Sequence, residues 1–248
     1  MNDDFYGKFF KKTYNCGRKM HMKKILVICI VLILTTQVAV AQFYDIASDE
    51  SKEKIEYLFE KRIIEGVGEN LFNPEKTVTR AEFAAMAVRA LGYTDMDARS
   101  FSDVSRGDWF YTAVSAAASA GVISGFPDGS FRPYETITHE QAVKILVNIY
   151  EKKYDIDPAG DMSTMFDDYY DISEWARESV SKGTMLSIAR SYKKIAHNNS
   201  GEIASADNGD RSDSGNNFIP QGAVTRSQAA DMIYALLNAL EISERVNV

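Results

Sequence analysis

One sequence pattern occurs three times in this chain, and it limits the possible folds more than any other feature. Residues 72–82, 131–141 and 218–228 each read F-x-P-x-x-x-[VI]-T-x-x-[EQ]. A pattern that recurs along a chain is typical of proteins built from similar units that bury their apolar faces against one another. We therefore expect three related structural units.

The end of each motif predicts the start of a helix. A Thr followed three residues later by Glu or Gln forms a capping box, in which the two side chains satisfy backbone N–H groups at the helix start. Apolar residues then recur at three- and four-residue spacing, as in Phe83, Met86 and Ala87, which indicates one buried stripe per helix. The capping pairs are Thr79 with Glu82, Thr138 with Gln141, and Thr225 with Gln228.

A second pattern precedes each motif and predicts a shorter helix. Phe43, Phe101 and Phe166 each stand two residues before an aspartate and shortly before a stretch with helical apolar spacing. We interpret the aspartates as turn-forming or capping residues ahead of the short helices. They are Asp45, Asp103 and Asp168.

A glycine lies between the short helix and the F-x-P segment in the first two units. Gly66 and Gly125 are explained most simply by a turn with positive φ, because glycine adopts that conformation without strain. The alternative is that a bound sugar approaches the backbone closely at these positions. The third unit lacks this glycine turn.

Together these patterns predict an all-α chain of three helix-loop-helix units. The expected units are residues 43–92, 101–150 and 166–240, with a linker at 151–165. A polar tract near 197–217 lengthens the third unit and has the composition of a surface loop. Its aspartates lack the spacing of a calcium-binding loop, so we expect no metal there; they are Asp207, Asp210 and Asp213.

Residues 1–41 have the pattern of a secretory signal behind an upstream extension. An unbroken apolar run, residues 25–34, follows a pair of lysines and precedes the small-residue sequence AVA at 39–41, which suits signal cleavage. The alternative is a transmembrane helix, but the run is shorter than the roughly 20 residues that a span needs. Both cysteines and an excess of Lys and Arg lie in this segment, so the exported chain is acidic and free of disulfides.

Composition narrows the function classes further. The net charge of −7 argues against a general nucleic-acid binder, which needs a basic face. The exported chain has no cysteine nucleophile, and its histidines, His139 and His197, do not form a zinc motif. A glycan hydrolase needs two carboxylates, which an acidic chain can supply. The repeats, however, leave no room for a catalytic domain, so we expect no enzyme and no cofactor.

The repeated motif resembles that of S-layer homology (SLH) domains. Residues 78–82, VTRAE, match the hallmark of that family, and residues 224–228, VTRSQ, are close to it. The second copy has His139 in place of the arginine. The resemblance covers about residues 43–240. It implies a pseudo-threefold assembly of three modules around a central bundle of the short helices, with grooves between modules that hold cell-wall polysaccharide.

The resemblance also implies non-covalent attachment to the cell wall, in this family often through a pyruvylated secondary polymer. The pyruvyl group carries a carboxylate, and a capped helix start would offer free N–H groups and the positive end of the helix dipole to such an anion. Arg80 and Arg226 would add charged donors. His139 would do so below about pH 6.5, where imidazole is protonated.

Two interpretations are open for the tryptophans that begin the short helices of the second and third units. Trp109 and Trp175 either stack on sugar rings or anchor the core. We interpret the Thr and Glu or Gln of each motif mainly as structural caps. The residues expected to contact polysaccharide are Arg80, Arg226, His139, Trp109, Trp175, Gly66 and Gly125.

The sequence therefore favours a secreted, non-catalytic protein of the cell wall or cell surface that binds polysaccharide or peptidoglycan. Its other possible partners are envelope proteins, and we expect neither nucleic-acid binding nor stable membrane insertion after signal cleavage. The alternative is a protein-interaction scaffold of the envelope whose modules no longer bind glycan.

Overall fold

The computed structural model describes residues 43–92, 101–156, 165–192 and 215–246. All of them belong to one compact unit, Phe43–Val248. The signal expected at residues 1–41 lies outside the described residues, as do the aspartates at 207, 210 and 213 and the tract 193–214.

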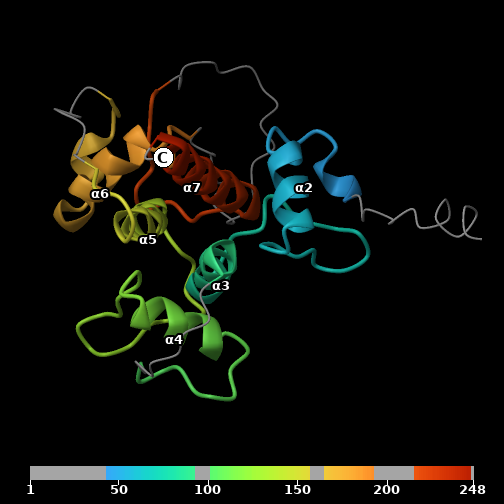
Figure 1. The fold of residues 1–248 in the computed structure, drawn as a ribbon, viewed down its shortest axis with the longest axis horizontal. Helices are drawn as coiled ribbons and strands as arrows, with labels where there is room; N and C mark the ends of the chain where they lie inside the picture. Colours follow the sequence, from blue (N-terminus) through green and yellow to red (C-terminus); the bar gives the residue numbers. More distant parts are fainter. Residues whose placement is uncertain (1–42, 93–100, 157–164, 193–214, 247–248) are drawn as a thin grey trace, which may run out of the picture. The chain divides into compact units, whose positions relative to one another are not determined.

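The described part of the chain is all-α, as the sequence predicts. It contains six α-helices and two short 3₁₀-helices and no extended strand (Figure 1). The elements in chain order are η1 (Tyr44–Ile46), α2 (Lys52–Glu60), α3 (Arg80–Leu91), α4 (Tyr111–Ser119), α5 (His139–Glu151), η2 (Tyr169–Asp171), α6 (Glu174–Met185) and α7 (Arg226–Val246).

The longer helix of each repeat begins directly after the threonine of its motif. At the start of α3, the Thr79 hydroxyl accepts a hydrogen bond from the Glu82 amide at 3.2 Å, and a Glu82 carboxylate oxygen accepts one from the Thr79 amide at 2.8 Å. The same reciprocal pair opens α5, between Thr138 and Gln141, and α7, between Thr225 and Gln228. The local sequence alone therefore fixes these three helix starts. We refer to α3, α5 and α7 as the capped helices.

Each short helix packs on the capped helix of the preceding repeat in cyclic order. Helix α4 packs on α3, α6 packs on α5, and α2 of the first repeat packs on α7 of the third. No repeat therefore covers its own apolar stripe, and the three repeats depend on one another for burial.

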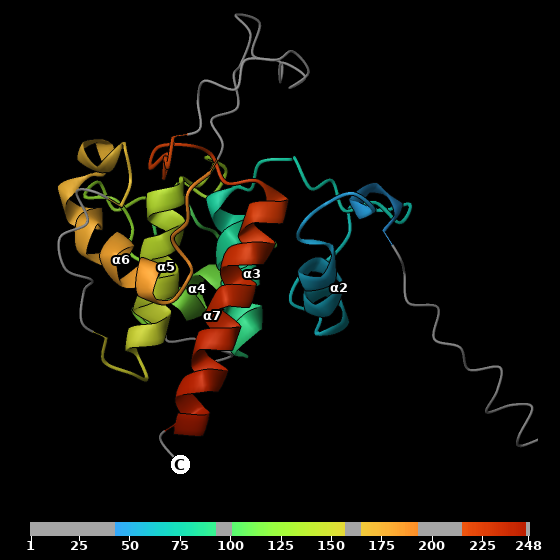
Figure 2. The same cartoon turned by 90° about the horizontal axis from the view of Figure 1, so that it is seen from above.

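The capped helices, and not the short ones, meet in the middle. Both α3 and α5 pack on α7, whereas α2, α4 and α6 lie outside them (Figures 1 and 2). The central bundle of short helices that the family resemblance implied is therefore wrong for this chain. The physical reason is the width of the apolar face. Helix α5 buries residues around most of its circumference, while the buried residues of α2 are Ile55 and Leu58.

A closed ring of backbone hydrogen bonds joins the three motifs. The Val78 amide donates to the Val224 carbonyl at 2.9 Å, Val224 donates to Ile137 at 3.0 Å, and Ile137 donates back to Val78 at 3.0 Å. All three residues are fully buried. The ring places the starts of α3, α5 and α7 side by side.

The phenylalanines of the two sequence patterns pair within each repeat. Phe72, Phe131 and Phe218, which open the F-x-P motifs, are fully buried. Each ring lies 5.3–5.5 Å, centroid to centroid, from the phenylalanine that opens the upstream pattern. These partners are Phe43, Phe101 and Phe166.

Candidate functional site

The helix starts are joined to the loop of the next repeat. The backbone amides of Arg80 and Ala81, the first two residues of α3, donate to the carbonyls of Glu135 and Pro133 at 2.9 and 3.0 Å. The first two amides of α5 and α7 donate in the same way, to Gly222 and Pro220 and to Lys76 and Pro74. The expectation of free N–H groups for an anion is therefore wrong. The neighbouring loop satisfies donors that an isolated helix would leave open.

Arg80 is buried at the junction of the first and second repeats, with 5% of its surface exposed. Its Nε donates to the Phe131 carbonyl and its Nη1 to the Gln141 side chain, both at 2.9 Å. The guanidinium also lies 4.7 Å from the centroid of the Phe131 ring, a cation–π contact. Desolvation lowers the pKa of this guanidinium. Nε and Nη1 of Arg80 thus each donate to the second repeat.

Arg226 has the same position at the junction of the third and first repeats. It is 6% exposed, and its Nε and Nη2 donate to the carbonyls of Phe72 and Glu65 at 2.7 and 2.6 Å. Desolvation again lowers the pKa of the guanidinium. Polysaccharide contact by Arg80 and Arg226 stays a prediction, and the structure gives both side chains a role in joining the repeats.

His139 fills the arginine position at the remaining junction. Its Nδ1 lies 2.9 Å from the Ile219 carbonyl oxygen and its Nε2 lies 3.2 Å from the Gln228 side-chain oxygen. The ring stacks on Tyr192, with centroids 4.1 Å apart and 14° between the planes. Burial lowers the pKa of the imidazole and raises that of the Tyr192 hydroxyl. Both neighbouring atoms are acceptor oxygens, so the neutral ring, which carries one N–H, donates to one of them.

The three aspartates of the upstream pattern hold the F-x-P loops. The Asp103 carboxylate accepts hydrogen bonds from the backbone amides of Phe131 and Arg132, both at 2.7 Å. Asp45 and Asp168 bind the equivalent amides of the first and third repeats. The predicted role as local turns or caps missed these contacts. The aspartates act across each repeat, and a local pattern does not reveal such a partner.

Gly66 and Gly125 are close-packing positions. Neither has positive φ, so the turn interpretation was wrong. A Cβ atom on Gly66 would lie 2.5 Å from Cε1 of Phe43, and one on Gly125 would lie 2.5 Å from the Ser130 carbonyl oxygen. A larger residue at Gly66 would displace the ring of Phe43, and one at Gly125 would displace the backbone at Ser130.

The two tryptophans are surface residues. Trp109 is 61% exposed and Trp175 is 53% exposed, so neither anchors the core. Trp109 packs edge-on against the buried Phe110, and Tyr134, which is 71% exposed, packs on the same ring. We call Trp109 and Tyr134 the aromatic pair of the second repeat. Tyr134 was not among the site residues expected from the sequence. Its position directly after the proline of the motif was the feature that could have identified it.

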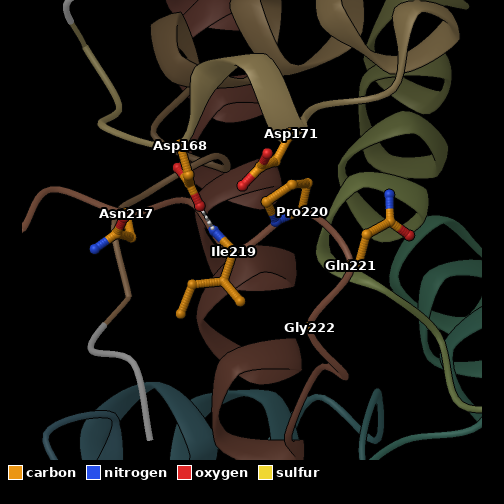
Figure 3. A pocket seen from close by; sticks show the side chains of 7 residues that line it. All are labelled: Asp168, Asp171, Asn217, Ile219, Pro220, Gln221 and Gly222. Atoms are coloured by element: carbon orange, nitrogen blue, oxygen red, sulfur yellow. Dashed lines mark hydrogen bonds between the residues drawn. The ribbon is translucent and has the colours of Figure 1, made fainter.

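A pocket of about 410 Å³ opens in the third repeat. Figure 3 shows Asp168 and Asp171 on one side of it and the segment from Asn217 to Gly222 on the other. The residues of this segment that line the pocket are Asn217, Ile219, Pro220, Gln221 and Gly222. The sequence indicated only a turn-forming role for Asp168 and did not predict this pocket, because the walls of the pocket come from segments on either side of the inserted tract.

In the ranges that the structure describes, no group of three or more His, Cys, Asp or Glu side chains is arranged to hold a metal ion. Among the same residues, no helix has the length and apolar character needed to cross a membrane.

Comparison with known proteins identifies the class. A family model for the S-layer homology domain matches residues 42–84 and 100–143. The chain is 37% identical over 197 residues to an amylopullulanase of Thermoanaerobacterium thermosulfurigenes, covering 79% of this chain and 9% of that protein. It is 36% identical over 197 residues to exoglucanase XynX of Acetivibrio thermocellus, covering 79% of this chain and 16% of that protein.

A third relative is a surface-layer protein. The chain is 27% identical over 235 residues to the surface-layer 125 kDa protein of Lysinibacillus sphaericus, covering 94% of this chain and 18% of that protein. The chain thus spans less than a fifth of the length of each of these three relatives.

The chain is an S-layer homology domain protein, with the domain matched in its first and second repeats. The domain type and the surface-layer relatives support cell-wall anchoring in general.

Proposed function

We propose that this protein is secreted and holds to the bacterial cell wall by binding a polysaccharide without catalysis, with a pyruvylated secondary polymer as the preferred ligand. All three repeats, residues 43–92, 101–150 and 166–240, act as SLH modules in a pseudo-threefold arrangement. The hydrogen-bonded ring of Val78, Ile137 and Val224 and the matching arginine and histidine positions at the three junctions support this arrangement.

The observation that carries the proposal is the aromatic pair of the second repeat. Exposed aromatic rings offer flat apolar faces to the C–H face of a sugar, and large aromatic side chains dominate many binding surfaces. Trp109 and Tyr134 both pack on the buried Phe110 ring, so the fold brings them to one part of the surface.

Two arginines accompany the aromatic pair. Arg106 precedes Trp109 by three residues and is exposed, and Arg132 precedes Tyr134 by two residues in the same loop. The guanidinium of Arg132 lies 3.8 Å from the centroid of the Phe126 ring and forms a 3.1 Å ion pair with Asp128. A ligand carboxylate can pair with Arg106 and compete for Arg132, which suits an anionic sugar.

The proposal assigns polymer contact to the exposed surface of the second repeat and support of that surface to the buried Arg80. Arg80 donates to the carbonyl of Phe131, directly before Arg132. Trp175 is a second exposed aromatic contact in the third repeat.

The test is co-sedimentation of residues 43–248 with purified wall sacculi before and after acid removal of the secondary polymer. We expect pelleting that disappears with the polymer and falls at least tenfold in affinity, about 1.4 kcal/mol, in a Trp109→Ala, Tyr134→Ala double variant. Ile242→Ala, which removes an exposed apolar side chain near the end of α7, is the control.

Other outcomes separate the alternatives. Pelleting that survives removal of the polymer would identify peptidoglycan as the ligand. A folded protein that does not pellet in either case would contradict wall binding and would favour the envelope scaffold.

A further inference from the structure

The pocket of the third repeat differs in chemistry from the corresponding surface of the second. The aspartate contacts set the correspondence: Asp103 binds the amides of Phe131 and Arg132, and Asp168 binds those of Phe218 and Ile219. By this register, Ile219 stands where the second repeat has Arg132, and Gln221 stands where it has Tyr134. Counted from Phe166 and Phe101, Asp171 stands where the second repeat has Arg106. Counted back from Trp175 and Trp109, Ile172 stands there, so neither count places an arginine at this position of the third repeat.

The third repeat therefore lacks both surface arginines, has Asp171 beside the pocket, and has Gly222 where the second repeat has Glu135. Asp168 and Asp171 line the pocket, and the buried Glu140 lies behind it, where its carboxylate accepts a 2.7 Å hydrogen bond from Nε2 of Gln221. In the part of the chain that the structure describes, no ion pair includes any of these three carboxylates.

One cation, Arg177, lies against this segment but is paired with neither Asp168 nor Asp171 in the described part of the chain. Arg177 donates from Nε to the Ile172 carbonyl at 3.2 Å, and its guanidinium lies 5.7 Å from the centroid of the Tyr169 ring. The carboxylates of the pocket thus give it a negative potential, which repels a carboxylate ligand and attracts a cation.

The remaining walls suit a sugar ring. Ile219 and Pro220 supply an apolar surface, and the Asn217 amide and the side-chain oxygen of Gln221 supply polar atoms for hydroxyl groups (Figure 3). Nε2 of Gln221 donates to Glu140 and Ser173. The volume of about 410 Å³ falls within the range of small-molecule sites, roughly 300–1,000 Å³.

We propose that this pocket binds a hexosamine unit that carries a free, protonated amino group, with Asp171 as the counter-ion. This inference rests on the proposed function, since it takes the ligand to be part of a wall glycan. It assigns different sugars to two repeats of one chain: the second repeat holds an anionic unit and the third holds a cationic unit.

The probe is a trimer of β-1,4-linked glucosamine, titrated into residues 43–248 by calorimetry, with its fully N-acetylated counterpart as the neutral comparison. Amide chemical shifts of Ile219, Gln221 and Gly222 report whether the ligand occupies the pocket. We expect the amino trimer to shift these amides and to bind at least tenfold more tightly than the acetylated trimer, about 1.4 kcal/mol.

The matched variants are Asp171→Arg, which reproduces the charge of the second repeat, and Glu174→Arg, which makes the same charge change at an exposed α6 residue outside the pocket lining. We expect Asp171→Arg to reduce binding of the amino trimer at least tenfold and Glu174→Arg to leave it nearly unchanged. Circular dichroism of both variants is the control for folding.

Three outcomes would overturn the inference: equal binding of the two trimers, equal loss in both variants, or chemical shifts outside the pocket. If the amino trimer does not bind while wall pelleting still depends on Trp109 and Tyr134, this inference fails and the proposed function stands. If wall pelleting is also absent, the proposed function fails with it.

Discussion

The Nε atom of Arg226, in the third repeat, donates a 2.7 Å hydrogen bond to the main-chain carbonyl of Phe72 in the first repeat. Its guanidinium lies 4.4 Å from the centroid of the same phenylalanine ring. One buried side chain therefore joins the first and last repeats through both a hydrogen bond and a cation–π contact. In both repeats that have it, the arginine of the repeated motif joins its repeat to the next.

Replacement of Arg226 by Ala should destabilise the fold. The carbonyls of Phe72 and Glu65 would lose their donors and a buried space would remain, so we expect the free energy of unfolding to fall by about 2–4 kcal/mol. Urea denaturation measures this change. Arg245→Ala, which removes an exposed arginine paired within α7, should change it by less than about 0.5 kcal/mol. Equal stability of the Arg226 and Arg245 variants would contradict the structural role.

Gly66→Ala should also destabilise the protein, because its Cβ would lie 2.5 Å from Cε1 of Phe43. Overpacking of this kind costs about 1–3 kcal/mol. The control is Gly107→Ala, where no atom lies within 4 Å of the new Cβ and φ is not positive. If the Phe43 ring is the cause, a Phe43→Leu change should cost less in the Gly66→Ala background than in the parent, and thermal denaturation of the double-mutant cycle tests this.

Ile219→Asn should stabilise the protein. Ile219 has φ of 55°, in the left-handed region that β-branched residues disfavour, whereas Asn73 has φ of 56° at the same place in the first repeat. Relief of the strain should raise the free energy of unfolding by about 0.5–1 kcal/mol, part of the 1–2 kcal/mol that the conformation costs. Chemical denaturation checks this. Ile242→Asn, at an exposed helical position, should give no such rise.

The stability of the protein should depend on pH through His139. Burial holds the pKa of His139 below 6.5 in the folded protein, although the Ile219 carbonyl, the Gln228 side chain and Asp168 oppose this shift. The unfolded chain binds its proton near pH 6.5. As the pH falls below 6.5, the unfolded state therefore gains protons first, and the free energy of unfolding decreases until the folded pKa is reached.

A His139→Gln variant removes this titration and leaves the other ionisable groups in place. Urea denaturation at several values between about pH 7.5 and 5.5 should show a steeper loss of stability for the parent than for the variant. Parallel curves would show that His139 does not titrate differently in the two states.

Local signals predicted the parts of the fold that depend on neighbouring residues. Thr79 and Glu82 form their capping box within one helical turn, so their spacing alone located the start of α3. The same reasoning found α5 and α7. It could not find that α2 packs on α7, because that pairing depends on residues from opposite ends of the repeat array.

The candidate site was harder to predict for the same reason. The burial of Arg80 depends on Phe131 and Gln141 of the next repeat, and the sequence of the first repeat contains no sign of either. Trp109 and Phe110 are neighbours in the sequence, and the fold buries Phe110 and exposes Trp109. The position of Trp109 before α4 was therefore compatible both with sugar stacking and with anchoring the core. The pocket beside Asp171 required the third repeat to be compared with the second in register.

The cyclic packing of short helices on capped helices has a mechanical consequence. Helix α2, near the start of the compact unit, lies against α7, at its end, and Lys54 binds Asp231 across this junction at 2.6 Å. Tension applied to the two ends of the unit therefore acts first on the seam between the first and third repeats. Once that seam opens, the hydrogen bond from Arg226 to Phe72 and the backbone hydrogen bond from Val78 to Val224 bear the load next. Rupture of the whole array therefore begins where the first and third repeats meet.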